Sequence, residues 1–153
     1  MSAGAPHLPT PVPAAPAPVP AGSGRRAWAV FTGRTEIAWL RVLRPGFRHC
    51  FLVLADGPHW VTMDPLAAFT EIAVQPVGAA FDLPGHLAAR GLTVVPAPLD
   101  HVPRRPAPWG PFTCVEAVKR AIGLADPRIV TPYQLYRRLA AAAERGSLRP
   151  WEA

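Results

Sequence analysis

Residues 47–64 have the sequence FRHCFLVLADGPHWVTMD, in which two apolar runs flank the dipeptide Asp56-Gly57. Asp-Gly between runs of β-favouring residues is a strong signal for a two-residue hairpin loop. With these two residues as the loop, His49 on the first strand lies directly opposite Asp64 on the second. Directly opposed side chains project from the same face, so the carboxylate can hold one nitrogen of the imidazole. The stretch therefore predicts a β-hairpin that pairs a histidine with an acid.

The same hairpin separates two other reactive side chains from this pair. Cys50 follows His49, and successive strand residues point to opposite faces of a sheet. We therefore expect Cys50 to be a buried and inert core residue. His59 lies close to the turn, and its parity places it on the face opposite Asp64. We interpret His59 as a histidine of the surface or of a substrate rim.

A second informative stretch is residues 112–116, FTCVE, which has the features of a helix start. Thr113 can cap the helix while Glu116 reaches back to the cap residue. Cys114 then lies in the first turn, where unpaired backbone N–H groups stabilise a thiolate. An imidazole beside such a thiol completes a nucleophile–base pair, so Cys114 is the candidate nucleophile and His49 the candidate base.

Two other interpretations of these residues stay open. A cysteine is more often a small packed hydrophobic residue than a nucleophile. A zinc site formed by His49, Cys50, His59 and Cys114 is conceivable, but the spacing matches no standard zinc pattern. We therefore expect neither a metal nor a cofactor.

The remaining elements follow from local patterns along the chain. Strands are expected at 28–31, 70–75 and 92–95 and a short helix at 82–89, while residues 35–43 could form a short helix or a strand. Residues 96–111 hold six prolines and predict an irregular loop that leads to the cysteine. The cysteine helix should run to about Ile122, with Gly123 just beyond its end. A last helix should begin at Thr131, with Pro132 in its first turn.

The chain of 153 residues is expected to contain one folded domain. Residues 1–24 are mainly Ala, Pro, Gly and Ser, so we expect a disordered tail there, and residues 25–153 are then the domain. The two cysteines are too few for a disulfide framework, which favours free thiols in a reducing compartment. No apolar run is long enough to span a bilayer and no signal peptide is evident, so we expect a cytoplasmic protein without a transmembrane anchor.

The charge of the chain is strongly basic, with a formal net charge of +6 and a pI of about 10.6. The arginines that carry much of the excess are scattered along the sequence, which is typical of a basic soluble surface. Attraction to an anionic polymer or membrane surface is the alternative. No nucleic-acid-binding motif is present, so we expect no specific nucleic-acid partner.

The order of the two reactive segments resembles that of circularly permuted NlpC/P60 (papain-like) proteins, in which a histidine strand precedes a cysteine helix. Residues 43–49, LRPGFRH, with the strand and Asp56-Gly57 that follow, look like the histidine segment of the lecithin retinol acyltransferase-like branch. Residues 113–120, TCVEAVKR, with Ile122-Gly123, look like its cysteine helix. Residues 131–136, TPYQLY, are similar to small phage-type and bacterial members. The resemblance covers residues 28–140, the greater part of the chain.

The resemblance implies an α+β fold, in which a small antiparallel β-sheet packs against the cysteine-bearing helix. It implies Cys114 as the nucleophile, His49 as the base and Asp64, on the strand after the histidine, as the third polar residue. The lipid-acyltransferase branch usually has a second histidine where Asp64 stands and an asparagine where Thr113 stands, and it often carries a membrane anchor. These departures favour amide or ester hydrolysis.

Three functions follow as expectations. The leading one is a thiol-dependent hydrolase, a peptidase or amidase with a Cys-His-Asp triad, for which peptidoglycan peptide is the natural substrate class by family analogy. The backbone N–H of Cys114 would contribute to its oxyanion hole. The second is a lipid thiol acyltransferase or thioesterase. The third is a non-catalytic structural or assembly module of a phage-type particle.

Overall fold

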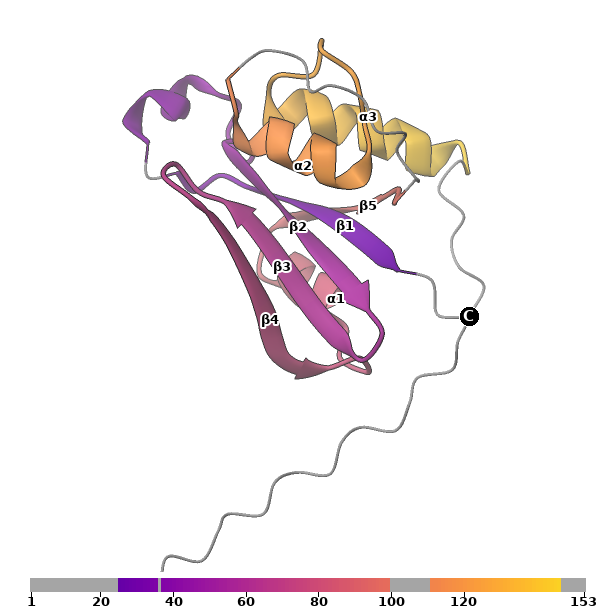
Figure 1. Cartoon of the computed structure of the whole chain (residues 1–153). Helices are drawn as coiled ribbons and strands as arrows, with labels where there is room; N and C mark the ends of the chain where they lie inside the picture. The colour runs from indigo at the N-terminus through magenta and orange to yellow at the C-terminus, as the bar shows by residue number, and fades with distance from the viewer. Residues whose placement is uncertain (1–24, 36, 100–110, 147–153) are drawn as a thin grey trace, which may run out of the picture.

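The computed structural model describes residues 25–35, 37–99 and 111–146 (Figure 1). Along the chain its elements are β1 (Arg26–Thr32), the 3-10 helix η1 (Ala38–Val42), β2 (His49–Asp56), β3 (His59–Pro65), β4 (Thr70–Gly78), α1 (Leu83–Ala89), β5 (Thr93–Ala97), α2 (Cys114–Ile122) and α3 (Pro132–Glu144). The predicted tail at residues 1–24 and most of the predicted loop at 96–111 lie outside the described residues.

The five strands form one antiparallel sheet in the order β4-β3-β2-β1-β5. Helices α2 and α3 lie on one face of this sheet and α1 lies on the other (Figure 1). The expected α+β class is therefore confirmed, as is the packing of the cysteine-bearing helix α2 against an antiparallel sheet. Residues 35–43, for which a helix and a strand were both open, contain the short helix η1.

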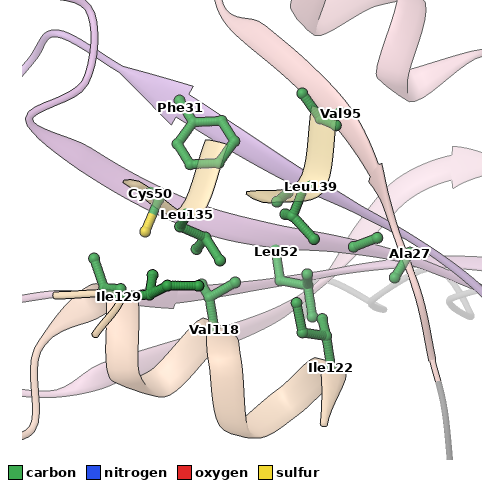
Figure 2. Close-up of a cluster of buried hydrophobic side chains, with 13 residues drawn as sticks. Ala27, Phe31, Cys50, Leu52, Val95, Val118, Ile122, Ile129, Leu135 and Leu139 are labelled. Carbon is green, nitrogen blue, oxygen red and sulfur yellow. The ribbon is translucent and has the colours of Figure 1, made fainter. Parts of the chain in front are cut away.

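The central strands β1 and β2 are apolar along most of their length because both of their faces are covered. The face under α2 and α3 forms the larger core (Figure 2), which includes Ala27, Ala29, Phe31, Cys50, Leu52, Val118, Ile122, Leu135 and Leu139. The face over α1 forms a second core from Trp28, Val30, Val53, Trp60 and Leu83. The two cores hold β1 and β2 as the rigid centre of the domain.

The β2–β3 hairpin corrects the predicted register by two residues. Its loop is Gly57-Pro58, because Asp56 pairs with His59 and Leu52 with Met63. Proline lacks an N–H and cannot take the ladder position beside the turn that the predicted loop would assign to Pro58. Gly57 has a φ of 57°, the conformation required at the first position of a type II′ loop.

In the observed register each residue of β2 has a different cross-strand partner from the predicted one, but every side chain stays on its predicted face of the sheet. Side chains along a strand alternate with a period of two, so a shift of two residues keeps every side chain on its predicted face. In the observed register His49 and Asp64 are diagonal neighbours instead of direct ones. Diagonal neighbours on one face are still within reach of a long or aromatic side chain.

Helices α2 and α3 begin with threonine caps, as predicted. Thr113 accepts a hydrogen bond from the backbone N–H of Glu116, and Gly123 ends α2 with a φ of 77°. The reciprocal contact expected from Glu116 is absent among the bonds described, because its carboxylate instead accepts from Lys119 and Arg120. At α3 the capping box of Thr131 and Gln134 is complete.

Candidate active site

The segment before His49 is fixed by an aromatic cluster. Phe47 packs against Phe31, Tyr133 and Tyr136, with ring centroids 4.8 to 5.8 Å apart. These contacts bind the turn before β2 to the first part of α3. The backbone N–H of Arg48 then donates to the carbonyl of Thr32 at 2.9 Å, which aligns the start of β2 with β1. His49 is the first residue of β2, and these contacts therefore fix the position of its backbone.

The three residues predicted for the site lie together. The Nε2 atom of His49 lies 2.6 Å from Oδ1 of Asp64, in a contact with only modest solvent exposure. His49 and Cys114 line the same cavity, and each shifts the pKa of the other. Because Asp64 holds Nε2, Nδ1 is the ring nitrogen left for the thiol. The structure thus brings Cys114, His49 and Asp64 together.

Cys114 is the first residue of α2 and is only partly buried. Thr113 on one side caps the helix, and Val115 on the other is fully buried in the core. The capped first turn and this apolar anchor hold the thiol at the end of the helix that points toward β2 and β3.

A fourth residue, Cys50, also contacts the thiol. It is fully buried, as predicted, in the cluster with Phe31 and Leu135 (Figure 2). It is not isolated from the site, however, because Cys114 packs against the same cluster and the two thiols shift each other's pKa. The burial of Cys50 was expected from the sequence, but its closeness to the candidate nucleophile was not. The signal that could have found it is its parity, which places it on the sheet face that α2 covers.

These contacts shift the pKa of the nucleophile strongly downward. The hydrogen bond from the Cys50 side chain lowers the pKa of Cys114, burial raises it, and hydrogen bonds from His49 and from the Cys50 backbone lower it further. The result is a pKa of about 4 for the Cys114 thiol. The hydrogen bond to Cys114, burial and the charge on Cys114 raise the pKa of Cys50 well above its ordinary value, so Cys50 remains neutral.

The pKa of His49 shifts in the opposite direction, upward. Burial by itself lowers the pKa of His49, but hydrogen bonds to Asp64 and Cys114 outweigh it and raise the pKa from 6.5 to about 9. Cys114 is then a thiolate above pH 4 and His49 an imidazolium below pH 9. At neutral pH the two residues form an ion pair, which is the state of an activated thiol nucleophile.

The pair opens into a cavity of about 720 Å³. His49, Asp64 and Cys114 line it together with two arginines, Arg34 and Arg48. Most of the other lining residues are apolar: Ile37, Leu40, Leu43, Phe51, Pro65, Leu66, Ala67, Leu92, Phe112, Val115, Val130 and Pro132. The cavity is large enough for a small molecule or a peptide segment. Sequence patterns did not indicate these lining residues, which come from separate segments.

His59 lies apart from the other three residues of the conceivable zinc site. His59 is exposed and begins β3 beside the turn, whereas His49 begins β2 at the opposite end of the hairpin. Among residues 25–35, 37–99 and 111–146, no group of three or more His, Cys, Asp and Glu side chains is placed to hold a metal ion. None of the helices in these ranges is long and apolar enough to cross a membrane.

The two cysteines should differ sharply in reactivity. We expect limiting iodoacetamide at neutral pH to label Cys114 in the native protein, because this thiol is ionised and faces the cavity, and to leave Cys50 unmodified, because it is neutral and fully buried. Mass spectrometry of peptides identifies the labelled residue, and labelling after denaturation serves as the control. Preferential native labelling of Cys50 would contradict the assignment.

Comparison of the chain with family models, with curated proteins and with solved structures finds no match.

Proposed function

We propose that the protein is a thiol-dependent hydrolase with a permuted papain-like domain, in which Cys114, His49 and Asp64 form the catalytic triad. The observation that carries this proposal is the hydrogen-bonded pair His49–Asp64 beside Cys114 at the wall of a cavity, with the pKa of the thiol lowered to about 4. A structural cysteine needs no such arrangement. Both cysteines are free, which supports action in a reducing compartment such as the cytoplasm.

Each residue has a role in the proposed reaction. The Cys114 thiolate attacks the carbonyl carbon of the substrate, and the backbone N–H of Cys114 contributes to the stabilisation of the oxyanion. The His49 imidazolium donates its proton to the leaving group, which leaves a thioester on Cys114. The now neutral His49 takes a proton from water, which attacks the thioester and releases the acid. Asp64 orients His49 and stabilises its charge.

The substrate class we propose is a peptide or amide, with peptidoglycan peptide as the leading example. Arg34 is exposed where it lines the cavity, so its positive charge is accessible to the carboxylates that such peptides carry. Association with a phage-type particle would fit such a substrate.

The apolar lining of the cavity favours a second candidate, a lipid thioesterase or thiol acyltransferase. Its chemistry is the same as far as the thioester on Cys114, and the two candidates differ in the acyl group that fills the cavity. Ile37, Leu40 and Leu43, from η1 and its flanks, provide one apolar wall for an acyl chain.

The proposal is tested by trapping the acyl-enzyme. We expect the purified protein to gain the mass of an acyl group on Cys114 when it is mixed with an activated peptidyl ester, and to show no gain in the Cys114→Ala variant. A long-chain acyl thioester, offered in parallel, distinguishes the lipid candidate from the peptide candidate. The proposal fails if neither donor acylates Cys114 while iodoacetamide still alkylates it.

A further inference from the structure

We propose that Cys50 and Cys114 form a peroxide-sensitive thiol pair, in which oxidation of Cys114 leads to a Cys50–Cys114 disulfide that blocks the site reversibly. The inference rests on the proposed function only in naming which activity the disulfide would silence. The oxidation chemistry itself requires the two thiols alone.

The placement of the two sulfur atoms supports this pair. The chain has two cysteines, and the packing of α2 on the sheet brings both to one point. Cys114 packs against the buried cluster that contains Cys50, and the interaction of the two thiols shifts the pKa of each. Cys114 faces the cavity, through which a small oxidant can enter, whereas Cys50 is closed off in the core. One thiol is thus placed to meet the oxidant and the other to resolve the product.

The first step is oxidation of the exposed thiol. The Cys114 thiolate attacks one oxygen of hydrogen peroxide, the O–O bond breaks, and hydroxide leaves. Cys114 becomes a sulfenic acid, with two electrons transferred from sulfur to peroxide. A thiolate that is accessible and fully ionised at neutral pH is the form that reacts in this way.

The second step uses the buried thiol. The Cys50 sulfur attacks the Cys114 sulfur, the S–O bond breaks, and the hydroxyl group leaves as water with the proton of Cys50. A disulfide of about 2.05 Å then joins the two sulfurs, whose side chains rotate toward one another to form it.

The charge balance explains why Cys50 is inert before oxidation and reactive after it. The largest contribution to the raised pKa of Cys50 is its hydrogen bond to Cys114, and the charge on Cys114 adds to it. Sulfenic acid is neutral, so oxidation removes the charge that kept Cys50 protonated. The buried thiol therefore becomes a better nucleophile at the moment when its partner becomes an electrophile.

The test uses the full chain and two matched variants. Cys50→Ser keeps a hydroxyl donor toward Cys114 but cannot form a disulfide, and Cys50→Ala removes both properties. Each protein is treated with about one equivalent of hydrogen peroxide, then with dimedone to trap sulfenic acid, and is analysed by intact mass. Trypsin separates the two cysteines into peptides 49–90 and 105–119, so a disulfide appears as a linked pair of peptides.

We expect the wild type to lose two hydrogens, to yield the linked peptides and to recover both thiols with dithiothreitol. We expect both variants to take up dimedone at Cys114 and, without dimedone, to proceed to sulfinic acid that dithiothreitol does not reverse. Dimedone or sulfinic acid on wild-type Cys114, with Cys50 still free after denaturation, would overturn the proposal.

The sulfur readouts keep this inference separate from the proposed function. Linked peptides in a protein that no acyl donor labels would sustain the thiol pair and reject the hydrolase. Acylation of Cys114 together with dimedone uptake by the wild type would do the reverse.

Discussion

Replacing His49 with alanine is expected to raise the pKa of the Cys114 thiol and so to slow its alkylation at pH 6. The His49 hydrogen bond and charge help to hold the pKa of this thiol at about 4, so nearly all of it is thiolate at pH 6 in the wild type. Once the pKa exceeds 6, each further unit lowers the thiolate fraction at pH 6 about tenfold. The Cys50 donor remains in the variant and limits the rise, because it makes the largest single contribution.

The measurement is the alkylation rate as a function of pH. A lowered pKa means that the thiolate persists as the pH falls, so the wild-type rate should stay nearly flat from pH 8 to pH 6 and decline only toward pH 4. We expect Asp64→Asn to shift the curve in the same direction as His49→Ala but less, because Asp64 acts through the histidine. His59→Ala, an exposed histidine of the same hairpin, is the matched control and should leave the curve unchanged.

One outcome would reject the catalytic pair. If the wild-type thiol titrates near the ordinary value of about 8.5 and neither His49→Ala nor Asp64→Asn moves it, Cys114 is not activated. The domain would then be a structural or assembly module, and replacing Cys114 would leave its function intact.

Replacing Glu116 with alanine is expected to lower the free energy of unfolding by about 3 kcal/mol. Glu116 accepts hydrogen bonds from Lys119 at 2.9 Å and from Arg120 at 2.8 Å. The Lys119 side chain is only 5% exposed and its Nζ also donates to the carbonyl of Ile129. Without Glu116 a buried ammonium keeps one carbonyl partner and no counter-ion among the described contacts, and an uncompensated buried charge is costly.

Urea denaturation measures this effect, and two further variants identify its cause. Arg120→Ala removes the more exposed partner of the same carboxylate and should cost less than about 1 kcal/mol. Adding Lys119→Met to Glu116→Ala removes the stranded charge and should restore most of the lost stability. Equal losses in Glu116→Ala and Arg120→Ala, or no recovery in the double variant, would contradict the explanation.

The contribution of Glu116 to the stability of the folded state should decrease as the pH falls. Burial opposes ionisation of Glu116, but hydrogen bonds from Arg120 and Lys119 outweigh it and lower the pKa of its carboxyl group. The folded state is then stabilised fully above the ordinary value of about 4.3, and this stabilisation is lost as the pH falls through the lowered value. Glu116→Ala should therefore reduce the acid sensitivity of the folded domain.

Much of the fold could be predicted from the sequence because its signals are local. The apolar runs of β1, β2 and β3, the threonine caps of α2 and α3 and the glycine after α2 each depend on a few neighbouring residues. The face of Asp64 was also predictable, because side chains alternate along a strand and a register error of two residues does not change the face.

The register of the hairpin needed one further piece of local chemistry. The Asp-Gly signal selected the wrong loop because Pro58, one residue later, cannot donate a hydrogen bond to the ladder. Weighing that missing donor against the dipeptide signal would have placed the loop at Gly57-Pro58. The information that fixes the loop is therefore present in the sequence.

By itself, then, the sequence determined the elements, the caps and the identity of the candidate nucleophile, base and acid. Only the tertiary structure decided that Cys114 packs against the cluster that contains Cys50 and that η1, β2, β3, α2 and the segment before α3 line one cavity. The physical reason is separation along the chain. The packing of α2 on the sheet brings Cys50 and Cys114 close to each other. This packing depends on the summed burial of side chains from many segments. It therefore cannot be predicted from the residue spacing within any one segment.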